Sequence, residues 1–218
     1  MSPDAKELDA KLEEALEESF PASDAPASFS VAEPADQVNV GIVIGSLRKG
    51  AYSRMAAKAL IELAPSSLNL HIVEILDLTL FNQDLEETPP TSWVEFRDAI
   101  RPLDAVIFVA PEYNRSMPAP LKNAVDIGSR PPGQSVWDGK PAAVLSTSPG
   151  ALGGISSNNH LHQTLAAVNM FTMAQPNVSL GNVSKSFDEG GNLTDERTRK
   201  YLASFLEKFE AWIQRVSS

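Results

Sequence analysis

Short apolar stretches alternate with longer helical patterns from residue 37 onward, and this alternation limits the possible fold more than any other feature. Val38–Ile44 has the sequence VNVGIVI, and residues 104–110 have the sequence DAVIFVA. Nearly continuous β-branched stretches of this length are typical of strands that are buried on both faces. Strands separated by helices pair in parallel through right-handed crossovers. We therefore predict an α/β fold, a doubly wound sheet between two layers of helices.

The other segments complete a pattern of five strands and five helices. The predicted strands are 38–44, 70–76, 104–110, 142–146 and a short one within 170–174. One predicted helix follows the loop at 45–53, and the others cover 91–103, 118–127, 159–168 and a closing stretch that ends near Val216. We predict Thr194 as the N-cap of the closing helix, since hydroxyl side chains accept hydrogen bonds from the first turn.

Residues 1–36 differ in composition from the rest of the chain. They carry ten of the 28 acidic residues, only two of the 18 basic ones, and none of the 12 glycines. Leucines at 8, 12 and 16 form a narrow apolar stripe, and a Pro-, Ala- and Ser-rich stretch follows. We predict an acidic, partly disordered N-terminal extension (1–36) and one domain (37–218). A docking helix for a partner is the alternative for the extension.

Charge and cysteine content exclude several classes of function. The formal net charge is -10, and no cluster of Lys and Arg offers a surface for nucleic acid. The sequence contains no apolar run of the roughly 18 residues that a membrane span needs, and no basic and apolar secretory signal. It also contains no cysteine, which excludes disulfides, Cys-ligated metals and thiol nucleophiles. We expect a soluble, cytoplasmic protein without nucleic-acid or membrane partners.

The three histidines do not indicate a metal site. His160 and His162 are two apart on a predicted helix, so their side chains point to different sides of it. His71 lies alone in a predicted strand. We predict structural roles for all three residues and no metal.

The loop after the first strand has the composition of a phosphate site. Residues 45–54 (GSLRKGAYSR) open a helix, so backbone N–H groups, hydroxyls and positive charge come together there. The loop lacks both the Gly-Lys-Ser/Thr ending of a nucleoside-triphosphate loop and the Gly-x-Gly-x-x-Gly dinucleotide turn. Hydroxyl groups suit a terminal phosphate monoester, such as that of FMN. Ordinary helix capping is the alternative.

Two more unusual loops follow the third and fourth strands, at the sheet edge where doubly wound folds bind ligands. Residues 111–123 (PEYNRSMPAPLKN) include Tyr113 and a run of backbone groups, which suit the face and the edge of a flat heteroaromatic ring. Residues 146–154 (STSPGALGG) combine hydroxyls with glycines, which allow close backbone approach to a ligand. A proline-stiffened turn and a flexible connection are the alternatives.

With these three loops in this order, the sequence resembles the NAD(P)H-dependent FMN reductase family, which includes bacterial quinone, azo and chromate reductases. The resemblance covers residues 38–216. It rests on the first loop, on PEYN at 111–114 with LKNAVD at 121–126, and on 148–154. It implies a flavodoxin-like three-layer sandwich, whose five-stranded parallel sheet has the order 2-1-3-4-5 with helices on both faces.

The resemblance also implies a cofactor, a reaction and site residues. FMN would be reduced by NADPH or NADH and would then reduce a small acceptor, a quinone, azo compound, chromate or free flavin, in ping-pong order. The flavin carries the chemistry, so no side chain is predicted to be catalytic. The FMN-binding residues implied are Ser46, Arg48, Gly50, Ala51, Tyr52, Ser53, Pro111, Glu112, Tyr113, Asn114, Ser148 and Gly150.

Members of this family pair through helices beside the flavin, which implies a homodimer or homotetramer. Arg115 and Arg130 would then contact substrate or the partner subunit. Within its own chain, Arg130 is expected near only one carboxylate, Asp126, at spacing four. A flavodoxin-like electron carrier or FMN-binding module without its own NAD(P)H step is the alternative function. The cations in these loops favour the enzyme.

Overall fold

A computed structural model describes residues 37–217 of the chain. The predictions for the acidic segment 1–36 lie outside the described residues. Within the described part, no helix has both the length and the apolar character that crossing a bilayer requires.

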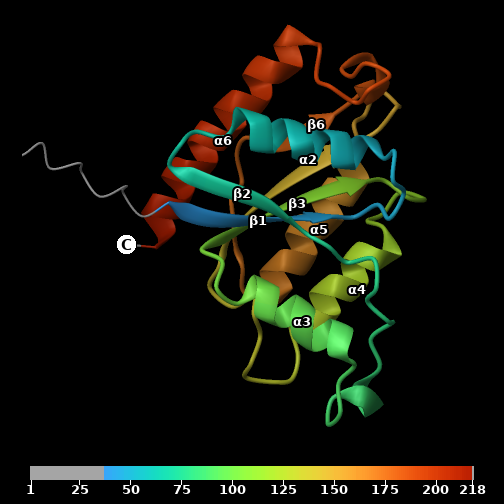
Figure 1. Cartoon of the computed structure of the whole chain (residues 1–218), viewed down its shortest axis with the longest axis vertical. Helices are drawn as coiled ribbons and strands as arrows, with labels where there is room; N and C mark the ends of the chain where they lie inside the picture. Colours follow the sequence, from blue (N-terminus) through green and yellow to red (C-terminus); the bar gives the residue numbers. More distant parts are fainter. Residues whose placement is uncertain (1–36, 218) are drawn as a thin grey trace, which may run out of the picture. The chain divides into compact units, whose positions relative to one another are not determined.

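A parallel sheet runs through the described part of the chain (Figure 1). Its strand order is β2-β1-β3-β4-β5, so the predicted order is confirmed. β6 is the sixth strand and also pairs with β4. The strands are β1 (Val38–Ile44), β2 (Leu68–Val73), β3 (Ala105–Pro111), β4 (Pro141–Thr147), β5 (Phe171–Thr172) and β6 (Val178–Leu180).

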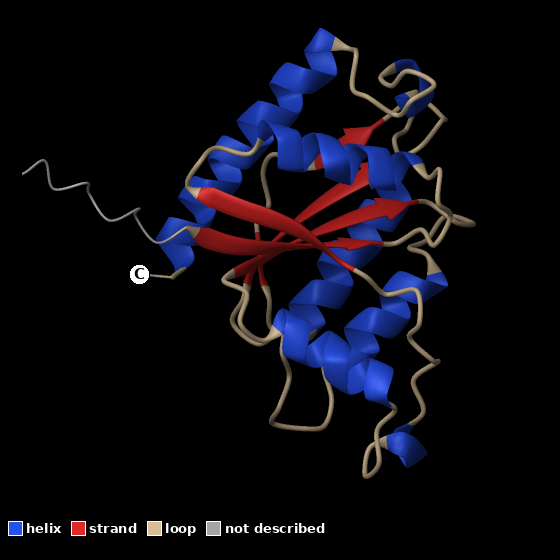
Figure 2. Ribbon diagram, viewed as in Figure 1, coloured by secondary structure: helices blue, strands red, loops and turns tan. Residues whose placement is uncertain are grey.

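Helices cover both faces of this sheet (Figure 2). One face carries α2 (Tyr52–Leu63) and α6 (Glu196–Val216). The other carries α3 (Thr91–Ile100), α4 (Ala119–Gly128) and α5 (Ile155–Ala167). Two short 3₁₀ helices, η1 (Gln83–Leu85) and η2 (Val183–Lys185), lie in the connections.

The central strands supply side chains alternately to two separate cores. Ile107 and Val109 of β3 pack with α2 and α6, whereas Val106, Phe108 and Ala110 pack with the helices of the other face. All five are fully buried. Because successive side chains of a strand point to opposite faces, a strand between two helical layers must be apolar at every position. This explains the uninterrupted apolar runs in the sequence.

The predicted short fifth strand is present, but a sixth strand that was not predicted shares its place beside β4. Phe171–Thr172 pairs only with the start of β4, and the separate strand β6 pairs with its end. Pro176 lies between the two segments, and proline cannot donate to a strand ladder. The sheet edge is therefore formed by two short pieces in succession.

Two helix starts also differ from the prediction. α6 is capped by Asp195, whose carboxylate accepts a hydrogen bond from the Thr198 N–H at 2.7 Å, so Thr194 is not the cap. α5 begins at Ile155, four residues before the predicted start at 159. It is preceded by Gly153 and Gly154, which both have positive φ. Two consecutive glycines are typical of a loop, so the sequence suggested a later helix start. The residue that stabilises this early start is distant in the chain and is described below.

Candidate functional site

The three loops meet at the carboxyl ends of β1, β3 and β4, along one edge of the sheet (Figure 1). They enclose a cavity of about 220 Å³. Most of the predicted FMN-binding residues line this cavity. The exceptions are Gly50, Asn114 and Gly150, which belong to the loops but do not line it. Thr147 and Pro149 also line it and were not predicted, although both flank the predicted Ser148. The lining consists of Ser46, Arg48, Ala51, Tyr52, Ser53, Pro111, Glu112, Tyr113, Thr147, Ser148 and Pro149.

The first loop leaves the start of α2 without a capping side chain. The N-cap residue is Ala51, which cannot cap, and the first turn contains no acidic residue. The Ser53 side chain is buried, with 1% of its residue surface exposed, and its Oγ atom has no hydrogen-bond partner. Free backbone N–H groups, the positive helix end and an unpaired hydroxyl are thus directed to one place. Ordinary side-chain capping does not occur at this helix.

Not every cation of the first loop is available to a ligand. Both terminal nitrogens of Arg54 donate to the Glu74 carboxylate at 2.8 Å. This bidentate hydrogen bonding lowers the pKa of Glu74 and raises that of Arg54. Arg54 therefore joins α2 to the end of β2, whereas Arg48 lines the cavity.

The second loop contains a tight hairpin from Tyr113 to Ser116. The two residues exchange backbone hydrogen bonds of 2.9 and 3.0 Å. The residues between them, Asn114 and Arg115, have φ values of 52° and 64°, as a two-residue type I′ turn requires. The Tyr113 hydroxyl lies 3.2 Å from Ser46 Oγ, so the hairpin is linked to the first loop at the mouth of the cavity.

Glu112 is the distant residue that stabilises the start of α5. Its Oε2 atom accepts hydrogen bonds from the backbone N–H groups of Ser156, at 2.9 Å, and Ser157, at 3.4 Å. The residue at the N-cap position is Gly154, which has no side chain that could accept these hydrogen bonds. Glu112 thus supplies the cap from 44 residues away. Sequence reasoning assigned Glu112 to the cofactor and missed this contact, because no local signal indicates it.

The third loop is held by hydrogen bonds and is not a flexible connection. Ser148 N–H donates to the Leu180 carbonyl at 3.0 Å, and Asn182 N–H donates to the Gly150 carbonyl at 3.0 Å. Gly153 has a φ of 64°, and a Cβ atom there would lie 2.5 Å from the carbonyl carbon of Ser179. Only glycine fits at this position.

The two arginines assigned to substrate or partner contacts lie in different surroundings. Arg115 is at the hairpin tip with a side chain that is 76% exposed. Arg130 Nε donates to Glu86 Oε1 at 2.6 Å, so the expectation that Asp126 is its only nearby carboxylate is wrong. Asp126 is bound instead by Lys122, at 2.6 and 2.7 Å. The connection around η1 brings Glu86 to the end of α4, a contact that residue spacing does not indicate.

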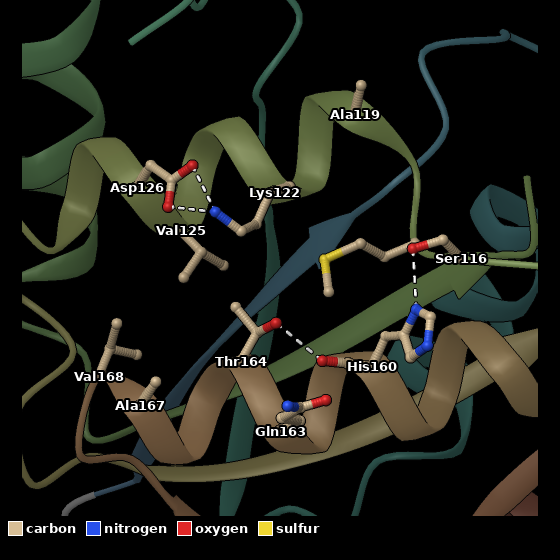
Figure 3. Close-up of a pocket in the computed structure, with 11 residues that line it drawn as sticks. Ser116, Ala119, Lys122, Val125, Asp126, His160, Gln163, Thr164, Ala167 and Val168 are labelled. Atoms are coloured by element: carbon tan, nitrogen blue, oxygen red, sulfur yellow. Dashed lines mark hydrogen bonds and ion pairs between the residues drawn. The ribbon is translucent and has the colours of Figure 1, made fainter. Parts of the chain in front are cut away.

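A second cavity, of about 690 Å³, lies between α4 and α5 beside the hairpin (Figure 3). At one end, Ser116 Oγ lies 2.9 Å from His160 Nδ1. The other end is apolar and is lined by Val125, Ala167 and Val168.

His162, which lies on α5 like His160, has a buried Nε2 atom without a hydrogen-bond partner, and burial lowers its pKa. In residues 37–217, no group of three or more His, Cys, Asp or Glu side chains is arranged to hold a metal ion.

Residues 38–185 match the family model of NADPH-dependent FMN reductases. The chain belongs to this family. Curated relatives include a quinone reductase of Pseudomonas putida, which is 53% identical over 177 residues, or 81% of this chain and 95% of that protein. A 2-hydroxy-1,4-benzoquinone reductase of a Burkholderia species is 41% identical over 81% of this chain and 97% of its own length.

Solved structures agree with this assignment to the FMN reductases. The flavoenzyme FerB of Paracoccus denitrificans, an NAD(P)H:(acceptor) oxidoreductase, superimposes with a TM-score of 0.77 at 38% identity, over 81% of this chain and 97% of that one. A WrbA-like flavodoxin of Agrobacterium tumefaciens, with a TM-score of 0.53 and 18% identity over 80% of this chain and 99% of that one, shows the shared fold. The predicted family, enzyme class and cofactors, FMN with NAD(P)H, are confirmed. The electron-carrier alternative is not favoured.

The cofactor of an FMN reductase fits the residues of the first loop. Its phosphate needs several hydrogen-bond donors, and the uncapped start of α2 leaves such donors free. The unpaired, buried Ser53 hydroxyl is costly unless a ligand satisfies it. A bound phosphate would satisfy both the free donors and this hydroxyl.

Proposed function

We propose that FMN binds in the cavity between the three loops, and that the enzyme reduces quinones. The observation that carries the proposal is the unpaired, buried Ser53 hydroxyl at the uncapped start of α2. The phosphate would be held by Ser46, Arg48, Gly50, Ala51, Tyr52 and Ser53. The ring would be held by Pro111, Glu112, Tyr113, Asn114, Ser148 and Gly150.

When bound, FMN accepts a hydride from NAD(P)H and passes it to the acceptor. The protein's own groups bind and orient the reactants. Hairpin backbone groups near Asn114 would meet the polar edge of the ring. The Tyr113 side chain, hydrogen-bonded to Ser46, lines the same cavity. No side chain of the chain is proposed to take or give a proton.

A quinone is the acceptor that we favour for two reasons. Relatives at 53% and 41% identity are named for quinone substrates. The second and third loops and the start of α5 also expose apolar side chains, with Tyr113 47%, Leu152 64% and Ile155 44% exposed. Flat, apolar acceptors bind to such surfaces by removing them from water.

We further propose that residues 37–218 form the reductase domain, with 1–36 as an extension, and that the enzyme works in the cytoplasm as a homodimer or homotetramer. The groove between α4 and α5 is the surface proposed for the second copy, because it begins at Ser116 of the flavin loop (Figure 3). Arg115 and Arg130 would contact substrate or the partner subunit. Arg130→Ala should then raise the KM for NAD(P)H while FMN is retained.

The test starts from the absorption spectrum of the purified protein and the mass of any flavin released from it. Anaerobic mixing with NADPH should bleach the flavin band rapidly, and a quinone should restore it. Bound FMN that NADPH cannot bleach would indicate an electron carrier instead. A protein that does not bind FMN, or binds riboflavin equally well, would overturn the phosphate site.

A further inference from the structure

A third cavity, of about 710 Å³, lies behind the third loop and takes no part in the site described above. Leu180 at the end of β6, with Gly181 and Asn182 after it, forms one wall. Lys185 at the end of η2 forms another, and the first turns of α6 form the third, with Asp195, Arg197 and Tyr201.

Two cations, Lys185 and Arg197, line this cavity. Neither Lys185 nor Arg197 makes an ion pair or a side-chain hydrogen bond within residues 37–217, although six other ion pairs occur there. Asp195 is the opposing charge, but both of its hydrogen bonds, to Thr198 N–H at 2.7 Å and Thr198 Oγ1 at 2.6 Å, hold its carboxylate on the helix that it caps. The hydrogen bonds to Thr198 and the charge of Arg197 lower the pKa of Asp195. Two cations against one carboxylate leave the lining of the cavity with a net positive charge.

The cavity also offers an aromatic surface. Tyr201 is 39% exposed. It follows Arg197 by four residues in α6, so the two side chains lie on the same face of the helix. A flat ring with a cation one turn away is suited to a heteroaromatic base that carries an anionic group.

Only one loop separates this cavity from the proposed flavin site. Ser148, which lines the flavin cavity, donates its N–H to the carbonyl of Leu180, which lines this one. A Cβ atom at Gly181 would lie 2.1 Å from the Ala151 carbonyl oxygen, so the loop and this wall are in direct contact. The linings of the two cavities are therefore in direct contact through this loop.

We propose that this cavity binds the adenosine 2′-phosphate end of NADPH, with Lys185 and Arg197 as the residues that distinguish NADPH from NADH. The inference rests on the proposed function, in which a pyridine nucleotide meets FMN on the other side of the loop. The phosphate dianion would interact with the two cations, and the adenine would lie against Tyr201. NADH lacks the 2′-phosphate and would not use the cations.

The test measures binding to the FMN-loaded protein by calorimetry, without turnover. The probes are adenosine 2′,5′-bisphosphate and 5′-AMP, which lacks the 2′-phosphate. The wild-type protein should prefer the bisphosphate, and Lys185→Ala with Arg197→Ala should remove that preference, with a loss of about fivefold per cation, the upper end for exposed charge pairs. Tyr201→Ser should weaken both probes equally.

The matched control is Lys200→Ala, which removes an exposed cation of α6 that does not line the cavity. It should leave both affinities unchanged. An equal loss in this control, or no preference in the wild-type protein, would overturn the proposal. If NADPH fails to bleach the flavin but the preference depends on Lys185 and Arg197, the proposed function fails and the site stands. If NADPH bleaches the flavin and the preference is absent, the site fails alone.

Discussion

The Glu112 carboxylate accepts a hydrogen bond from the Ser156 N–H at 2.9 Å, so the loop after β3 caps a helix that begins after β4. One turn further along α5, His160 lies 2.9 Å from Ser116 Oγ. The hairpin between Glu112 and Ser116 is therefore fixed to α5 at both of its ends. A loop tied in this way keeps its backbone groups in place before a ligand arrives.

Replacing Glu112 should affect both stability and the proposed cofactor site. Glu112→Ala removes the cap, which costs about 0.5–2 kcal/mol in folding free energy, and it releases the hairpin, so FMN affinity should fall. Glu112→Gln keeps an acceptor oxygen and should restore most of the affinity. Thermal melting and FMN titration measure the two effects. Asp195→Ala, which removes the equivalent cap of α6, should lower stability without changing FMN affinity; an equal loss of FMN there would argue against a specific role for Glu112.

Ser53→Ala should weaken FMN binding without destabilising the flavin-free protein. The Ser53 hydroxyl is buried without a partner, so its removal should not destabilise the flavin-free protein. FMN binding should weaken by roughly 1–3 kcal/mol, the scale of a hydrogen bond to a charged group. The affinity for riboflavin, which lacks the phosphate, should not change. Lys58→Ala, on the exposed side of α2, is the control, and parallel losses for both flavins would contradict the prediction.

His162 should make the folded protein less stable in mild acid. Burial lowers the pKa of His162 below its ordinary value near 6.5. In mild acid the unfolded chain therefore binds a proton at His162 more readily than the folded chain does. The free energy of unfolding falls as the pH drops below about 6.5 toward the folded pKa. His162→Leu should reduce the difference between melting temperatures at neutral pH and in mild acid. His71→Gln, in an exposed position of β2, should leave the difference unchanged.

Sizing by light scattering should give a dimer or tetramer that depends on the groove between α4 and α5. Ala167→Arg places a long cation in that groove and should produce a monomer that still binds FMN. Glu207→Arg places the same side chain on the exposed face of α6 and should not change the size. A wild-type monomer, or an Ala167→Arg protein of unchanged size, would remove this surface from the proposal.

The sequence predicted most reliably what local pattern determines. β1 has the predicted bounds, and β3 differs by one residue at each end, because a strand between two helical layers must be apolar throughout. Once the strands are located, the loops that follow them are located as well. Contacts between distant segments could not be predicted: Glu86 with Arg130 and Glu112 with α5 each join residues 44 positions apart. The early start of α5 depends on the contact with Glu112, so the sequence did not predict it.

Three helices begin along the loop-bearing edge, and they differ in what they offer an anion. The start of α5 is occupied by the Glu112 carboxylate. α4 begins with Pro118 as its cap and Pro120 in its first turn, and neither proline has an N–H to donate. α2 alone of the three has neither a capping side chain nor a proline in its first turn. We therefore expect FMN to bind with its phosphate at α2, because the reverse pose would set the phosphate against the Glu112 carboxylate.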